Sequence, residues 1–213
     1  MGPRVVGPNK NSDASGSGLW SSWHIAGKCT PMGCPEYVIR KQLKCLYMYL
    51  GETYKYGVGV FAAKQFRTGE IVLIDDDGDY FDRVCSFREL CEKGYDIEHM
   101  MQVGLDAFRL PTGSPEDFFN HSCDPNIGIR LNARGQIIVA LRDIAPHEEL
   151  TYDFSTYFNN PYERFRCRCG ARNCRGIIDN FSTLPVELKR RYRALGIVGD
   201  FVELDDGQGE AAD

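Results

Sequence analysis

Residues 117–126, reading Asp-Phe-Phe-Asn-His-Ser-Cys-Asp-Pro-Asn, pack polar, turn-forming and metal-competent residues behind an aromatic pair. Asn120 and His121 carry side chains that can bond neighbouring backbone. Pro125 keeps the residue before it out of the helical region and so predicts a turn. Cys123 lies between these two halves. Taken alone, the run is equally compatible with an ordinary capped loop around a buried thiol.

Three other motifs accompany this run in a fixed order. Gly-Val-Gly-Val occupies residues 57–60, and Glu-Glu-Leu-Thr-Tyr-Asp-Phe occupies residues 148–154. Cys167, Cys169 and Cys174 follow with C-x-C-x4-C spacing. In this order the motifs closely resemble those of the SET-domain protein-lysine methyltransferases, including their cysteine-rich post-SET segment.

The resemblance covers residues 56–176 and implies a fold as well as an activity. The expected fold is mainly β with short helices, of the SET type, with small curved sheets, a threaded (pseudoknot) C-terminal segment and a C-terminal helix. The expected division is a disordered extension over 1–50, a SET domain over 51–160, a post-SET zinc segment over 161–178, and a helix with an acidic tail over 179–213.

The composition fits one soluble domain. With 213 residues and 43% hydrophobic content, the chain can bury one sizeable core. No run approaches the roughly 18 apolar residues of a membrane helix, and no signal-peptide pattern opens the chain, so we expect an intracellular protein without membrane contact. Its compartment would be cytoplasmic in a bacterium and nuclear otherwise.

The net charge indicates which class of partner to expect. A net charge of −5 disfavours a general phosphate-binding surface and suits a basic peptide, so we expect no direct nucleic-acid partner. Plain solubility explains the same charge equally well.

Nine cysteines, an odd count with three in a metal-like cluster, favour a reducing compartment over a disulfide framework.

The three clustered cysteines favour zinc over incidental thiols. Cys167, Cys169 and Cys174 supply three thiolates, whereas structural zinc strongly prefers four ligands. Cys123 is the candidate for the fourth, and the resemblance implies this arrangement. A metal there would pin the C-terminal cysteines over the active site.

Periodicity predicts the elements that must position these motifs. Strands are expected over 58–62, 70–74, 100–103, 107–110, 127–131 and 136–141, with a hairpin turn over 132–135. Ser86 and Glu89 form a capping-box signature for a short helix that ends at Gly94. A second helix over 185–196 places Leu184, Leu188, Tyr192 and Leu195 on one face and a solvated basic surface on the other.

Other features receive structural interpretations. Residues 1–27 are rich in Gly, Ser, Asn and Pro, which predicts disorder, and the domain's late beginning suggests a true start at Met48. Cys29, Cys34 and Cys45 are interpreted as incidental thiols. The acidic run over 75–79 lacks the alternation and the terminal Glu of a calcium loop, so a turn is expected there.

By the resemblance, S-adenosylmethionine is the cofactor. The backbone around Val58 approaches it, which explains the small residues at 57 and 59. Asn120 and the His121 backbone hold its amino-acid and adenine parts, although a purely structural histidine is equally compatible. The implied cofactor residues are Gly57, Val58, Gly59, Asn120, His121 and Tyr152.

Lysine methylation requires a neutral amine aligned with the sulfonium methyl. A narrow, dry channel beside a positive sulfonium disfavours the ammonium form, and aromatic walls with a few oxygens can hold the amine. The family's catalytic tyrosine corresponds to Phe154, which lacks the hydroxyl. Tyr152 occupies the position that controls methyl number, and Asp76 occupies another position where the family usually has tyrosine.

The sequence therefore predicts an S-adenosylmethionine-dependent protein-lysine N-methyltransferase that contains zinc and acts on a basic, histone-like protein or peptide. Tyr152 and Phe154 are its candidate catalytic positions. The alternative is a SET module of little or no activity that binds cofactor or peptide, because Phe154 replaces the expected tyrosine.

Overall fold

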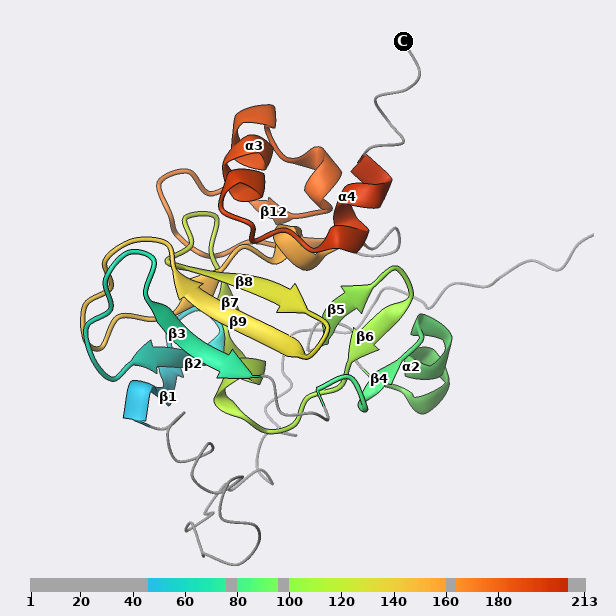
Figure 1. Ribbon diagram of the computed structural model, residues 1–213, viewed down its shortest axis with the longest axis horizontal. Coiled ribbons are helices and arrows are strands. Elements are labelled where there is room, and N and C mark those ends of the chain that lie inside the picture. Colours follow the sequence, from blue (N-terminus) through green and yellow to red (C-terminus); the bar gives the residue numbers. More distant parts are fainter. Residues whose placement is uncertain (1–45, 76–79, 96–99, 160–163, 207–213) are drawn as a thin grey trace, which may run out of the picture. The chain divides into compact units, whose positions relative to one another are not determined.

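The computed structural model describes residues 46–75, 80–95, 100–159 and 164–206, and these form small sheets with short helices (Figure 1). The central sheet has the order β3-β9-β8, from β3 (Ile71–Asp75), β9 (Gly135–Ala140) and β8 (Ile127–Asn132). A second sheet has the order β4-β6-β5, from β4 (Val84–Cys85), β6 (Ala107–Arg109) and β5 (Met101–Gly104).

Three two-stranded sheets complete the β structure. They are the antiparallel pair β1 (Met48–Thr53) and β2 (Gly57–Ala62), the parallel pair β7 (Asn120–His121) and β10 (Thr151–Tyr152), and the antiparallel pair β11 (Phe165–Arg166) and β12 (Ile177–Ile178). The helices are α2 (Phe87–Lys93), α3 (Val186–Ala194) and α4 (Asp200–Asp206), with 3-10 turns η2 (Pro115–Phe118), η3 (Phe154–Tyr157) and η4 (Phe181–Thr183). The mainly β fold class predicted from the sequence is confirmed.

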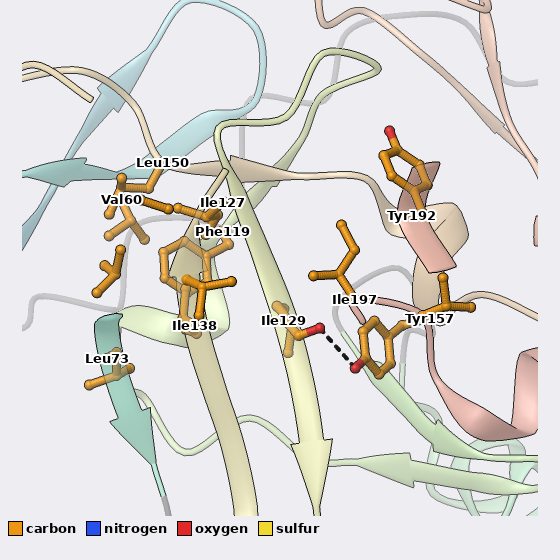
Figure 2. Packing of buried hydrophobic residues seen from close by; sticks show 14 of the residues in the cluster. Val60, Leu73, Phe119, Ile127, Ile129, Ile138, Leu150, Tyr157, Tyr192 and Ile197 are labelled. Atoms are coloured by element: carbon orange, nitrogen blue, oxygen red, sulfur yellow. Dashed lines mark hydrogen bonds between the residues drawn. The ribbon is translucent and has the colours of Figure 1, made fainter. Parts of the chain in front are cut away.

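The main core lies against the central sheet and reaches the C-terminal helices (Figure 2). Ile129 and Ile138, directly paired across β8 and β9, are almost completely buried. The Tyr157 hydroxyl donates to the Ile129 carbonyl over 3.1 Å and accepts from the Leu131 N–H over 3.1 Å, which satisfies a phenol that the core would otherwise leave without partners. Tyr192 of α3 is 1% exposed, so this helix is anchored in the core.

Both predicted helices are confirmed, with their local signals. The Ser86 side chain accepts from the Glu89 N–H and the Glu89 side chain accepts from the Ser86 N–H, which is the expected capping box. Gly94 ends α2 in the left-handed conformation. Leu184 and Tyr192 are buried on the predicted apolar face of α3.

Two boundaries differ from the sequence prediction. The extension was expected to run to residue 50, but β1 begins at Met48 and pairs with β2 along its whole length. Partner pairing, which an irregular sequence pattern does not reveal, holds this strand in place. The acidic tail contains α4, in which Phe201 and Val202 are buried and so supply the apolar face of a helix.

Several predictions fall on residues outside the described ranges: the disorder predicted over 1–27, and those made for Cys29, Cys34, Cys45 and Asp76. Asp75 is described, and it is a buried strand residue whose carboxylate accepts from Gln136 and lies 3.6 Å from the Arg109 guanidinium. Among the described residues, no helix has the length and apolarity to cross a membrane.

Candidate functional site

Parallel pairing of β7 with β10 brings together two motifs that lie about thirty residues apart in the chain. Thr151 pairs with Asn120 and Tyr152 with His121. Buried Asn126 supports the junction: its side-chain amide donates to the Glu149 carbonyl over 2.7 Å, and its side-chain oxygen accepts from the Thr151 N–H over 2.8 Å. The asparagine therefore supplies hydrogen bonds that a strand pair of two residues cannot supply by itself.

The glycine-rich strand β2 lies on the other side of the Glu-Glu-Leu-Thr-Tyr segment. The Leu150 N–H donates to the Val60 carbonyl over 2.7 Å, and Glu149 forms a bridge with Phe61. Residues 149–152 thus lie between β2 and β7. As a result, the backbone of Gly57 to Gly59, Asn120 and Tyr152 all belong to one group of contacting strands.

Gly59 has no room for a side chain. A Cβ atom there would lie 2.7 Å from Glu149 Oε1 and 2.8 Å from Asn120 Nδ2. Gly57 is favoured for a different reason. Its φ is 79°, a backbone conformation that residues with side chains rarely adopt. Of the two glycines, Gly59 is required by the close approach of neighbouring side chains, and Gly57 by its backbone conformation.

The hydrogen bonds of Asn120 fix the orientation of its amide. Its Nδ2 donates to the Val58 carbonyl over 3.0 Å and to Glu149 Oε1 over 2.8 Å. A carbonyl and a carboxylate can only accept, so the amide nitrogen must face them, and both of its donors are used. The atom left for a ligand is the acceptor Oδ1, which suits the ammonium group of an amino-acid moiety.

Glu149 is a functional candidate that the sequence reasoning did not single out. It belongs to the Glu-Glu-Leu-Thr motif, but the motif alone does not show which carboxylate turns toward Asn120. Glu148 is directed elsewhere: its carboxylate accepts from Asn126 and from the Ala145 N–H and pairs with Arg142. The two adjacent glutamates are distinguished only in the folded chain, where Asn120 of β7 contacts both Val58 of β2 and Glu149.

The His121 side chain faces the cysteines. Its Nδ1 accepts from the Phe154 N–H over 3.1 Å, so the ring proton belongs on Nε2, which lies 3.3 Å from Cys123 Sγ. Burial lowers the pKa of His121 to about 4 despite the nearby Asp153, so the imidazole is neutral at neutral pH. This supports the structural interpretation of the side chain, and the backbone of His121 stays available for other contacts.

The four predicted metal-ligating cysteines lie close together. Cys167 Sγ is 3.7 Å from Cys123 Sγ and 3.6 Å from Cys174 Sγ. Possible ligand atoms of His121, Cys123, Cys167 and Cys169 all lie within 4.8 Å of one another, which makes the histidine and Cys174 competing fourth ligands. Since Nε2 of the neutral ring carries its proton, the four-sulfur set fits a structural zinc ion better.

Burial raises the pKa of the Cys123 thiol and raises that of Cys167 to about 11. Zinc requires thiolates, so binding of the metal would release the protons that burial otherwise retains. His121 Nε2–H then lies where it can donate to a Cys123 thiolate and support its charge.

A buried ion pair joins the cysteine segment to the same region. Asp153 is 1% exposed, and each of its oxygens accepts from the Arg175 guanidinium over 2.7 Å. The Tyr192 hydroxyl of α3 donates to Asp153 over 3.0 Å, and the Arg175 N–H donates to Cys123 Sγ over 3.4 Å. One carboxylate thus connects the Tyr-Asp-Phe motif, the cysteines and the C-terminal helix.

Tyr152 and Phe154 are in ring contact, with centroids 4.7 Å apart. Burial raises the pKa of Tyr152, so its phenol remains protonated at neutral pH. Phe154 begins η3 and packs edge-on against His121. Residue 154 contributes an aromatic face without a hydroxyl, as the sequence indicated.

Residues 57–155 match the family model of the SET domain. The match begins at the first glycine of β2 and ends just after the Tyr-Asp-Phe motif. The cysteine segment, α3 and α4 lie C-terminal to it.

Curated relatives carry the same domain in much longer proteins. The chain is 32% identical over 144 residues to a putative histone-lysine N-methyltransferase 1 of Plasmodium falciparum, covering 62% of this chain and 2% of that protein. It is 30% identical over 202 residues to the histone H3-lysine(4) N-trimethyltransferase ATX1 of Arabidopsis thaliana, covering 84% of this chain and 18% of that protein. The methyltransferase domain of human SETMAR superposes with a TM-score of 0.46 at 22% identity, over 62% of this chain and 58% of that one.

Proposed function

We propose that this chain transfers a methyl group from S-adenosylmethionine to a lysine of a protein, with a basic, histone-like protein or peptide as its substrate. The observation that carries the proposal is the Asn120 amide. Val58 and Glu149 hold it with its carbonyl oxygen as the remaining acceptor, beside Gly59, where no side chain fits. Relatives named as histone-lysine N-methyltransferases support the same reaction class.

The residues of the site would hold the cofactor from two sides. Asn120 Oδ1 would accept from its ammonium group, and the backbone of Gly57 to Gly59 would lie along it. When bound, S-adenosylmethionine supplies an electrophilic methyl group on a positively charged sulfur. The partly buried Tyr152 and Phe154 rings, which contact each other, would line one wall of the site and exclude water from the amine.

Lysine must lose its proton before it can react, because the free side chain has a pKa of about 10.4. An apolar wall disfavours the ammonium form and so lowers that pKa within the channel. The uncharged Tyr152 hydroxyl can accept a hydrogen bond from the amine or donate one to it. Phe154 cannot, so Tyr152 is the residue expected to position the amine's lone pair.

Zinc would support this site from the C-terminal side through Cys123, Cys167, Cys169 and Cys174. The ion would hold the cysteine segment in place and would take no part in methyl transfer. Hydrogen bonds connect the cysteine cluster to the active site. His121 accepts from the Phe154 N–H, and Arg175 donates to Asp153.

A second candidate function is favoured by one observation. Phe154 removes the hydroxyl expected at the catalytic position, so the domain could bind cofactor or peptide with little turnover. In that case S-adenosylmethionine would bind with the same dependence on Asn120 while methyl transfer stayed near background.

Incubation with methyl-labelled S-adenosylmethionine and a panel of basic proteins, including histone H3, separates the two functions. Label in lysine, lost in Asn120→Ala, supports the transferase. Cofactor binding by calorimetry without label in any panel member supports the binding module. Absence of cofactor binding by the folded, metal-replete protein would exclude both.

A further inference from the structure

The net charge of the chain conceals a strongly basic C-terminal region. Between Arg164 and Arg193 the sequence has nine arginines and lysines against two carboxylates, whereas the whole chain carries −5. The expectation of no nucleic-acid partner was based on the net charge of the whole chain. The distribution of charge along the folded chain gives a different expectation.

Alternating burial separates the two kinds of side chain in the cysteine segment, which begins in β11. Cys167 and Cys169 are buried, while Arg166 and Arg168, which alternate with them, are exposed. Alternate residues of an extended chain point to one face at a spacing of roughly 6.7 Å. The cysteine cluster therefore forces the arginines outward as a row, and exposed Arg172 follows in the next turn.

The turn between β1 and β2 extends this row. The Lys55 ammonium donates to the Cys169 carbonyl, and the Tyr56 hydroxyl accepts from the Arg168 N–H over 3.0 Å. Tyr54, in the same turn, is fully exposed. We define the arginine row as Lys55, Arg166, Arg168 and Arg172, with Tyr54 beside it.

The guanidinium groups of the row are available to a partner. Within the described residues, Arg166, Arg168 and Arg172 have no carboxylate within ion-pair distance, whereas Arg164 pairs with Asp179 over 3.0 Å. Three exposed guanidiniums in one short segment, with no carboxylate partner among the described residues, favour an anionic ligand, because each offers a planar fork of donors that matches phosphate.

We propose that the arginine row binds the phosphate backbone of nucleic acid, independently of methyl transfer. Protein interfaces deplete charge at their centres, and the row itself contains no aliphatic side chain that could form such a centre. Nucleic-acid interfaces are polar, wet and strongly positive, which matches this surface. The contacts are to phosphates, so binding is independent of base sequence.

The test is fluorescence anisotropy of the metal-replete protein with a labelled DNA duplex of about 30 base pairs. If the row contacts three phosphates, the affinity falls about 40-fold between roughly 50 mM and 200 mM salt. The triple variant Arg166→Gln, Arg168→Gln, Arg172→Gln should bind at least about tenfold more weakly at the lower salt and show a smaller salt slope.

A matched control removes three exposed cations around α2: Arg83→Gln, Arg88→Gln, Lys93→Gln. This control should keep the wild-type affinity and slope, and both variants should keep the wild-type melting temperature and metal content. Equal loss in both variants would overturn the localisation to the row. Absence of duplex binding at low salt, or tighter binding of labelled polyglutamate than of duplex by the same row, would overturn the proposal.

Discussion

At Gly59, the missing side chain lets Glu149 and Asn120 approach the strand to within hydrogen-bonding distance of each other. The chemistry of the site depends on that contact, because an amide that used its oxygen internally would present donors to a ligand. Here the two donors of Asn120 face Val58 and Glu149. The strand glycine and the acceptor chemistry are therefore two parts of one arrangement.

Glu149→Leu should weaken S-adenosylmethionine binding by about 1–3 kcal/mol, because the Asn120 amide loses an acceptor and can turn. Glu149→Gln keeps a side-chain oxygen in place and should largely restore the affinity. Methylthioadenosine lacks the amino-acid moiety that Asn120 would contact. Calorimetric titrations with both ligands therefore distinguish a turned Asn120 amide from a general loss of folding. Equal weakening for both ligands would show that Glu149 supports the fold alone.

Phe154→Tyr should raise the single-turnover rate of methyl transfer by roughly tenfold to 10²-fold with little change in cofactor affinity, since the new hydroxyl acts mainly on the transition state. Tyr152→Phe should abolish most of the natural activity. Rapid-quench measurements on one lysine peptide compare the three proteins. Strong natural activity that neither change alters would mean that the lysine channel lies elsewhere.

At the scale of elements, local signals predicted what local interactions determine. The capping box of α2 and its terminal Gly94 act within a few residues, and the β8 to β9 hairpin pairs neighbours in sequence. Strand β1 lacks such a signal because its order depends on β2. The buried apolar residues of α4 were likewise hidden within an acidic stretch, since burial of Phe201 depends on the core around Tyr157.

The candidate site divides in the same way. Asn120 and the cysteines could be selected from residue type, spacing and resemblance. The roles of Glu149 and Arg175 could not, because each depends on a contact between distant segments. Asp153 is the clearest case: a motif residue in the sequence, it becomes the junction of three elements only in the folded chain.

Arg175→Leu should destabilise the protein by about 3–5 kcal/mol, because it leaves the Asp153 carboxylate buried without its cation. Arg67→Leu, which removes a partner from the exposed pair with Asp143, should cost less than about 1 kcal/mol. Urea unfolding of both variants measures the difference. Similar midpoints would show that the buried pair contributes no more than a surface pair.

Considered as a whole, the molecule connects a β domain to a C-terminal segment through its cysteines. Cys123 lies two residues after the end of β7, whereas its sulfur partners lie more than forty residues further along the chain. A metal that joins them closes a long loop, so its removal should affect the fold as well as the site.

The purified protein should contain about one zinc ion, and Cys123→Ser should lower both its zinc content and its melting temperature. Cys91→Ser, on the exposed side of α2, is the matched control and should change neither. Elemental analysis and thermal unfolding give the two readouts. Wild-type zinc content in the Cys123 variant would remove this residue from the metal site.

A crystal structure with S-adenosylhomocysteine would show directly whether the cofactor lies between the glycine strand β2 and the Asn-His motif of β7. We predict that the ligand's ammonium group donates to Asn120 Oδ1, with the Gly57 to Gly59 backbone alongside and the Asn120 nitrogen still bonded to Glu149. A ligand bound away from β2 and β7, or an Asn120 amide turned to donate to it, would contradict the account.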